Sequence, residues 1–324
     1  MSPRSGLDAI IAALCAFAAS PVCAQSSYPT QSVRIIVATA AGSGVDIATR
    51  IIAPKLSAAL GQQFVVENRP GAGGNLAGEA AARAAPDGYT LLMIPAGMAI
   101  NPAVYAKLGY SLERDFETVA LVSAAPLVFG IHPSLPARSL KAFIGLAKAR
   151  PGALSYASSG NGSSPHLSVE IFKMQAGVDI VHVPYKGSPQ GVVDLLAGQV
   201  SLMMAATSSL MPHVQSGRVR GLAVSSKERT PGAAGLPTMH EAGLPGYEAI
   251  TWAGLVAPAG VSKDIVEKLN REVNAAVRLP DVRAQLAVQR LDPFTSTPQE
   301  FRSYLRAEIA KSGKVVKAVG ARVD

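Results

Sequence analysis

Cysteine is almost absent from this chain of 324 residues, because the two that occur, Cys15 and Cys23, both lie within the first 24 positions. We expect those positions to be removed as a signal peptide. The remaining chain then offers no disulfide, no thiolate nucleophile and no cysteine ligand for a metal. An exported protein without disulfides relies on a large hydrophobic core, which suits a periplasmic domain better than a small secreted one.

Aromatic and charged residues are also scarce, at 5% and 16%, and Trp252 is the single tryptophan. A cleft for oligosaccharides usually contains several stacking rings, so the composition disfavours a sugar polymer as ligand. The formal net charge is +8, but the basic residues are scattered along the chain. We therefore exclude nucleic acid as a partner and interpret the positive charge as an attraction for small anions.

Several catalytic and cofactor motifs are missing. The chain has no GxxxxGK[ST] loop and no GxSxG elbow, and residues 71–75 fail the last position of the dinucleotide fingerprint. No cofactor is therefore predicted. No metal site is predicted either, because the five histidines show no HxxxH spacing and no nearby acidic cluster: His132, His166, His182, His213 and His240. Ser163 and His166 have the spacing of a nucleophile and its base, but also that of an N-cap and a first-turn residue.

Apolar residues make up 48% of the chain, which is enough for a large core and excludes disorder. The N-terminal segment has one early cation, Arg4, then apolar residues 9–19 and the small residue Ala24, after which we place the cleavage. This predicts export to the periplasm. A membrane anchor is the alternative, but eleven apolar residues cross only half of the roughly 30 Å hydrocarbon core. A second alternative is a lipoprotein with lipid on Cys23, although the residues before Cys23 match the lipoprotein pattern poorly.

Strand-like and helix-like patterns alternate, which is typical of a parallel α/β sheet, and the pattern restarts midway as if for a second lobe. Pro54 predicts a kink or a late start in its helix. Two more helices follow, one through Ile265 and Val277 and one through Phe301, but periodicity does not assign them to a lobe. We expect strands at residues 33–38, 63–67, 89–94, 127–131, 154–157, 180–183, 200–204 and 219–225, and helices at 45–60, 76–85, 139–150, 165–176, 188–197 and 208–216.

Gly- and Ser-rich loops at residues 41–44, 71–75 and 158–164 follow predicted strands and open predicted helices. Ligands of open α/β sheets bind at this edge, where free N–H groups and the positive ends of helix dipoles point into the same space. The loops therefore predict a site for an anion or polar ligand, although glycine and serine also serve simply as turns and N-caps. Lys186 follows another strand, and either reaches the anion or is a solvated loop residue.

Five motifs resemble one known family, the substrate-binding receptors of tripartite tricarboxylate transporters, which include the Bug receptors of bordetellae. The motifs are VVENRPGAGGN (65–75), APDGYTLL (85–92), YASSGNGSS (156–164), VHVPYKG (181–187) and EAGLPGY (241–247). They occur in the family's order, and the resemblance covers nearly all of residues 28–320.

The resemblance implies a type II periplasmic binding protein: two α/β lobes joined by crossing strands, with a ligand cleft between them. Lobe 1 would comprise residues 25–125 and 248–324, and lobe 2 residues 126–247. The implied protein is a monomeric receptor without catalytic activity, its partners being a small carboxylate and the membrane components of a transporter. The ligand contacts implied are Ala41, Gly42, Ser43, Gly44, Asp46, Ala96, Gly97, Ser158, Ser159, Gly160, Asn161, Gly162, Ser163, Tyr185, Lys186, Ala206 and Thr207.

Two loops depart from the family pattern. The first usually reads Pro-Gly-Gly but is Ala41-Gly42-Ser43 here, with Asp46 kept, and the loop after Met204 lacks the family's acidic residue and asparagine. A buried ammonium group needs such an acidic partner, so we expect an organic acid without an amine. An enzyme of the transferase or hydrolase class, and a ligand-dependent partner of a sensor, are the competing interpretations.

Overall fold

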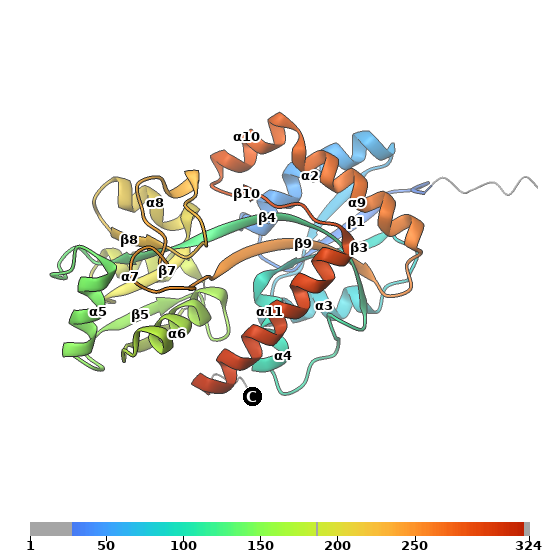
Figure 1. Ribbon diagram of the computed structural model, residues 1–324. Helices are drawn as coiled ribbons and strands as arrows, with labels where there is room; N and C mark the ends of the chain where they lie inside the picture. Colours follow the sequence, from blue (N-terminus) through green and yellow to red (C-terminus); the bar gives the residue numbers. More distant parts are fainter. Residues whose placement is uncertain (1–27, 186, 321–324) are drawn as a thin grey trace, which may run out of the picture.

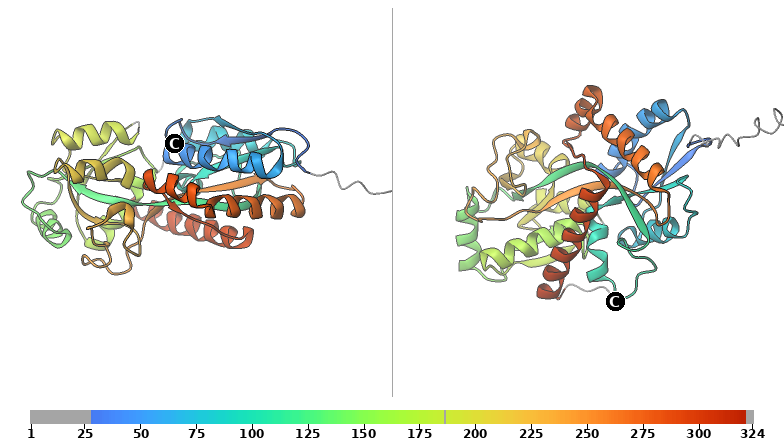
Figure 2. Two further views of the ribbon diagram at one scale, coloured as in Figure 1. Left: turned by 90° about the horizontal axis from the view of Figure 1, so that it is seen from above. Right: turned by 45° about the vertical axis from the view of Figure 1, so that its right-hand side comes forward.

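The computed structural model describes residues 28–185 and 187–320 of the chain (Figure 1). The expected signal peptide and Lys186 lie outside the described residues. Figure 1 shows two groups of strands and helices side by side, connected by the long strands β4 (Phe116–Ile131) and β9 (Ile250–Pro258). The view from above in Figure 2 shows β4 running from one group into the other.

The first group is a sheet in the order β2–β1–β3–β9–β4. Strands β2 (Phe64–Asn68), β1 (Val33–Val37) and β3 (Thr90–Pro95) are parallel, and β9 lies antiparallel between β3 and β4. Ile35 and Ile36 of β1 are both fully buried, because helices cover both faces of the sheet. This is why the strand is continuously apolar.

Helices from both ends of the chain cover this sheet. On one face, α2 (Gly44–Leu60) packs with α9 (Lys263–Arg278) and α10 (Pro280–Val288). On the other face, α3 (Asn75–Ala82) and the first half of α11 (Pro298–Val319) enclose Trp252. The C-terminal helices therefore pack against the N-terminal strands, an assignment that periodicity did not provide.

The second group continues the same sheet. From Leu127 onward β4 pairs with β7 (Leu202–Ala206) and β8 (Arg220–Val224), and β7 leads to the parallel strands β5 (Ser155–Ser158) and β6 (Val181–Pro184). The change of partner falls at Pro126, since residues 116–126 pair with β9. The faces are covered by α5 (Leu140–Ala149) and α6 (Ser164–Ala176), and by α7 (Ser188–Leu196) and α8 (Thr207–Gln215).

Helix α11 contacts both groups. Its first turns pack Phe301 and Leu305 into the first group, and its last turns pack Val315 and Val316 against Leu167 of α6. Between these contacts, Lys311 Nζ donates a hydrogen bond to the carbonyl of Glu248, just before β9. Among the described residues, no helix combines the length and the hydropathy needed to span a membrane.

Two local expectations need correction, and two elements were not predicted. Residues 127–131 are only the last part of the 16-residue strand β4. Helix α2 begins at Gly44 and continues through Pro54, so the late start is excluded, and the alternative, a kink at Pro54, stays a prediction. The short strand β10 (Asp292–Pro293), which pairs with β4, and helix α10 were not predicted: β10 has only two residues, and α10 buries only Val282 and Leu286.

Candidate functional site

The loop between β1 and α2, which we call the first-lobe loop (residues 40–46), is folded around an aspartate. Ser43 is the N-cap of α2, and its Oγ accepts from the backbone N–H of Asp46 at 3.3 Å. The N–H of Gly42 donates to Asp46 Oδ2 at 2.9 Å. Gly42 has a φ of +79°, which glycine adopts without the steric cost of a side chain.

The other oxygen of Asp46 holds the loop to neighbouring elements. Oδ1 accepts from Arg50 Nε and from Asn68 Nδ2, each at 2.9 Å, and Asp46 is only 2% exposed. Burial raises the pKa of this carboxyl, but the hydrogen bonds from Gly42, Asn68 and Arg50 and the charge of Arg50 outweigh it, so the pKa lies below the usual value. Asp46 is thus an ionised carboxylate whose two oxygens are engaged within its own lobe.

The loop between β5 and α6, which we call the second-lobe loop (residues 158–166), repeats this bonding scheme. Ser163 is the N-cap of α6, and its Oγ accepts from the N–H of His166 at 3.4 Å. The N–H of Gly162 donates to His166 Nδ1 at 3.1 Å. In both lobes, therefore, the glycine before the N-cap serine donates to the side chain four residues later.

Further hydrogen bonds close the second-lobe loop on itself. Ser158 Oγ lies 2.7 Å from His182 Nε2 and accepts from the N–H of Gly160 at 3.1 Å. The hydroxyl of Ser163 donates to the carbonyl of Gly160 at 2.7 Å. The hydroxyl of Ser163 therefore donates to a carbonyl, and Nδ1 of His166 accepts from Gly162, so neither is hydrogen-bonded to the other as a nucleophile is to its base. They act instead as an N-cap and a first-turn residue, the alternative that the sequence left open.

Other predicted site residues use their side chains for internal bonds. The hydroxyl of Tyr185 donates to Asp194 Oδ2 at 2.6 Å. Burial, together with this hydrogen bond and the charge of Asp194, raises the pKa of Tyr185 to about 12. The hydroxyl of Thr207 donates to the carbonyl of Arg290 at 3.0 Å, and Thr207 is fully buried.

Elements of the two groups meet around the loops. A side chain on Gly162 of the second group would place its Cβ 3.1 Å from Val104 of α4 (Asn101–Val104) in the first group. Ala96, in the 3-10 turn η2 (Ala96–Ala99), lines a cavity of about 40 Å³ together with Ser164 of α6. The structure therefore brings the η2 turn close to the second-lobe loop. The next residue, Gly97, has open space where its Cβ would be.

The third Gly-rich loop, residues 71–75, has a different environment. Asn75 Oδ1 accepts from Asn101 Nδ2 at 2.6 Å and from the hydroxyl of Tyr110 at 2.9 Å. Asn101 Nδ2 also donates to the carbonyl of Gly73 at 3.0 Å. This loop is thus fixed against α4, and its polar groups serve the interior of the first group.

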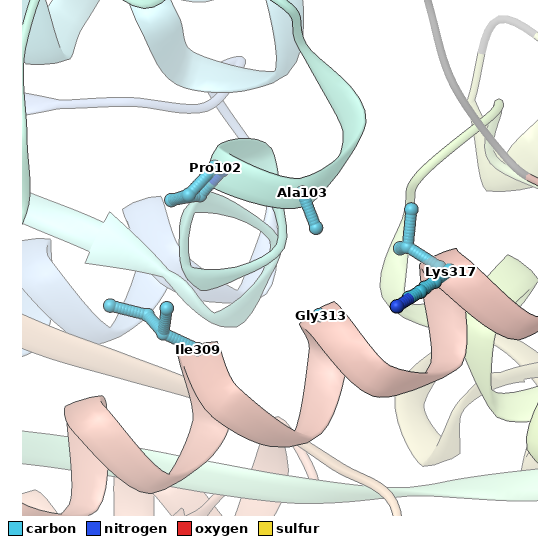
Figure 3. Close-up of a pocket in the computed structure, with 6 residues that line it drawn as sticks. Pro102, Ala103, Ile309, Gly313 and Lys317 are labelled. Atoms are coloured by element: carbon cyan, nitrogen blue, oxygen red, sulfur yellow. The ribbon is translucent and has the colours of Figure 1, made fainter.

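A larger cavity of about 370 Å³ lies between α4 and α11 (Figure 3). Figure 3 shows Ile309 and Lys317 of α11 on one side and the short helix α4 on the other. None of its lining residues belongs to the predicted site: they are Pro102, Ala103, Ile309, Gly313, Val316 and Lys317. Within the described part of the chain, no group of three or more His, Cys, Asp or Glu residues is placed to hold a metal ion.

Three contributors to the loops were missed from the sequence. Asn68 binds Asp46, His182 binds Ser158, and the backbone of Arg290 binds Thr207. The first two lie inside motifs that carried the family resemblance, so a polar residue at the end of a strand was the available signal. Arg290 had no such signal. It has a φ of +55°, and its side chain donates to the carbonyl of Gly232 at 3.0 Å.

Comparisons with known proteins agree with this architecture. A family model described as "Tripartite tricarboxylate transporter family receptor" matches residues 48–321. The protein BugT of Bordetella pertussis is 36% identical over 307 residues, which cover 94% of each chain.

Two solved structures share the fold. Rpa4515 of R. palustris, solved with adipate, superimposes with a TM-score of 0.82 at 37% identity, covering 91% of this chain and all of its own. MatC of Rhodopseudomonas palustris, solved with bound malate, gives 0.77 at 32% identity and covers 89% of this chain and all of its own. The expected fold class, an α/β solute-binding protein, is confirmed. This chain belongs to the family of tripartite tricarboxylate transporter receptors.

Proposed function

We propose that this protein is an exported, non-catalytic receptor that closes two lobes on a small organic carboxylate. Lobe 1 comprises residues 25–125 and 248–324, and lobe 2 residues 126–247. The observation that carries the proposal is the pair of matching helix starts, one in each lobe, each preceded by a loop whose glycine and serine are already bonded in place. Helix N-termini attract anions through free N–H groups and the helix dipole.

We assign the ligand contacts mainly to the backbone of the predicted site residues. The side chains of Asp46, Ser158 and Thr207 are buried and bonded within the protein. The first-turn N–H groups of α2, at Gly44 and Val45, have no acceptor within a helix. Such N–H groups bind a carboxylate without the cost of ordering long side chains.

The proposed ligand is a dicarboxylate without an amine. A helix N-terminus in each lobe suits a molecule with an anionic group at each end. An ammonium group would need an acceptor, yet both oxygens of Asp46 are engaged and the loop at Ala205–Thr207 carries no acidic side chain. The relatives solved with adipate and malate support this class. Closure around the ligand presents a distinct surface to the membrane components of a tripartite transporter in the periplasm.

A thermal-shift and calorimetry screen tests the proposal with adipate, malate and succinate against glutamate and aspartate. At about 100 times its dissociation constant, a ligand adds about 2.7 kcal/mol of stability. We expect at least one dicarboxylate to bind where the amino acids do not. Tight amino-acid binding would exclude the proposed ligand class. If NMR detects that the protein converts a bound acid to a product, the proposal of a non-catalytic receptor is excluded.

A matched pair of variants locates the cleft. Gly97 and Gly145 both have open space where a Cβ would be, and both have ordinary φ values. Gly97 lies in the η2 turn next to the interlobe cavity, whereas Gly145 lies on α5 at the outside of lobe 2. Gly97→Leu should abolish dicarboxylate binding, and Gly145→Leu should leave it unchanged. If both variants bind the dicarboxylate equally well, the ligand site is not next to η2.

N-terminal sequencing of exported protein tests the location. The mature chain should begin near Gln25. A retained Met1, or lipid on Cys23, would contradict the assignment of residues 1–24 as a cleaved signal peptide.

A further inference from the structure

Three aromatic rings are stacked beneath the second-lobe loop. The ring of Tyr156 lies 4.7 Å from that of His182, which lies 4.1 Å from that of His166, with interplanar angles of 18° and 14°. They come from β5, β6 and α6, the three elements that support the loop. Each histidine also bonds to the loop, His166 to the N–H of Gly162 and His182 to Ser158 Oγ.

The hydrogen bond from Gly162 defines the protonation state of His166. A backbone N–H is always a donor, so Nδ1 must be an acceptor and the ring must be neutral, with its proton on Nε2. A second proton would place a donor against the donor of Gly162. His166 is only 5% exposed, so water does not readily replace the lost partner.

The charged groups around the rings act in opposite directions: Glu170 favours a charged His166 and Lys173 disfavours it. Glu170 Oε1 accepts from the hydroxyl of Tyr156 at 2.5 Å and from Lys173 Nζ at 2.9 Å, so this carboxylate is already partnered. Glu308 and Lys311 of α11 line the cavity beside Ser164, and they pair with each other at 3.7 Å.

The pKa values of both imidazoles agree with this picture. Burial lowers the pKa of His166. The negative charge of Glu170 raises this pKa, and the positive charge of Lys173 lowers it further. Burial, His166 and Lys173 lower the pKa of His182 to about 4. If both rings were charged, two positive charges would lie on rings whose centroids are 4.1 Å apart, and they would repel each other.

We propose that His166 and His182 are positioning residues of the second-lobe loop, which is assembled for ligand only while both rings are uncharged. The proposal rests on the proposed function, in which this loop contacts the carboxylate. Protonation would break the Gly162 bond, separate the stacked rings and loosen residues 158–163. Acid would therefore release the ligand through lobe 2, while the carboxylate of Asp46 still holds the first-lobe loop.

A titration without ligand tests the loop by itself. In ¹⁵N-labelled protein, His166 Nδ1 should have the chemical shift of an unprotonated acceptor at about pH 7, and the Gly162 amide should resist exchange. Below the pKa of the pair, the imidazole shift and the loss of Gly162 protection should occur together. A charged His166 at neutral pH, or a Gly162 amide that stays protected throughout, would overturn the proposal.

Conservative variants test the coupling to ligand, with adipate and malate as probes. His166→Asn keeps an acceptor near the position of Nδ1, and His182→Gln keeps a polar group near Nε2, but neither side chain gains a charge. Below the pKa of the pair, wild type should lose up to about tenfold more affinity per pH unit than the double variant. Protonation of the ligand itself is common to both proteins and cancels in this comparison.

Two further variants separate positioning from general stability. His166→Leu removes the acceptor and should weaken binding at about pH 7 by tenfold or more, whereas His166→Asn rescues it. His240→Leu is the matched control and should leave binding unchanged, because His240 Nδ1 also accepts from a glycine N–H, that of Gly246 at 2.9 Å, but at the exposed end of the lobe. Parallel loss of affinity in wild type and the double variant would refute the coupling. If neither acid binds any of these proteins, the proposed function fails, and the ligand-free titration still decides the role of the histidines.

Discussion

The first-lobe and second-lobe loops solve the same geometric problem with different chemistry. In each, a serine caps the helix and the preceding glycine donates to a side chain at the third helical residue. That side chain is a carboxylate in lobe 1 and an imidazole in lobe 2. The shared requirement is an acceptor, so the backbone geometry does not determine whether the acceptor carries charge.

The surroundings of the two acceptors differ accordingly. Asp46 is bonded to the cation Arg50 and the amide of Asn68, both of which favour its ionised form. His166 is buried and stacked on a second imidazole, and its burial favours the neutral form. One lobe thus uses a stabilised ion and the other a stabilised neutral base, and acid should affect them at different pH values.

The largest effect should come from removing the carboxylate. Asp46→Leu leaves the N–H of Gly42, the amide of Asn68 and the guanidinium of Arg50 without their acceptor. We expect a loss of about 2–4 kcal/mol in the free energy of unfolding, measured in urea. Asp264→Asn is the control: Asp264 also lies in the first turn of a helix, α9, but is exposed, and should cost less than about 0.5 kcal/mol.

A pH series should separate the two loops. The folded-state pKa of His182 is about 4, below the ordinary 6.5, so the folded protein binds fewer protons and loses stability as pH falls from 6.5 to 4. The pKa of Asp46 is lowered from 3.8, so its contribution persists above that value and is lost only below it. Unfolding in urea across this range should show a decline in wild type that is much smaller in the His166→Asn, His182→Gln variant. An equal decline would assign the pH dependence to other groups.

Adding one methyl group to each loop glycine should sharpen the comparison. Gly42 and Gly162 have φ values of +79° and +72°, so alanine strains both by about 1 kcal/mol. Only at Gly162 would the methyl also meet another side chain, that of Val104 at 3.1 Å. Gly162→Ala should therefore cost more than Gly42→Ala, as measured by chemical unfolding. Val104→Ala should recover the difference in a double-mutant cycle. If the two changes in the free energy of unfolding are additive, the alanine methyl at position 162 and the side chain of Val104 are not in steric conflict.

The smallest effect should be the loss of the caps, where the lobes are alike. Ser43→Ala and Ser163→Ala each remove one acceptor from a helix N-terminus, at a cost of about 1 kcal/mol. Thermal unfolding should give similar losses for the two variants. Each hydroxyl has a second partner, Thr39 Oγ1 for Ser43 and the carbonyl of Gly160 for Ser163, so a much larger loss at one serine would assign the difference to that second hydrogen bond.

The sequence predicted local features better than contacts between distant segments. Glycine and serine between a strand and a helix predicted both loops, because the φ and capping requirements are local. The extent of β4 was missed, since its buried residues lack the alternation that marks a half-buried strand. The stack of Tyr156, His166 and His182 depends on the pairing of Tyr156 with His182 between β5 and β6 and on the position of α6 above them. The contact between Thr207 and Arg290 joins residues 83 positions apart.

The position of β9 has a consequence for the order in which the chain acquires its structure. The strand lies between β3 and β4, so the first sheet has no continuous path of hydrogen bonds until residues 250–258 are present. The second group needs no such late segment, because its strands β5 to β8 and the end of β4 all come from residues 127–224. Segments close in sequence find one another faster than distant ones. The sheet of the second group is therefore the first that a growing chain can complete, and the N-terminal strands wait for β9, which is made after all the strands of that sheet.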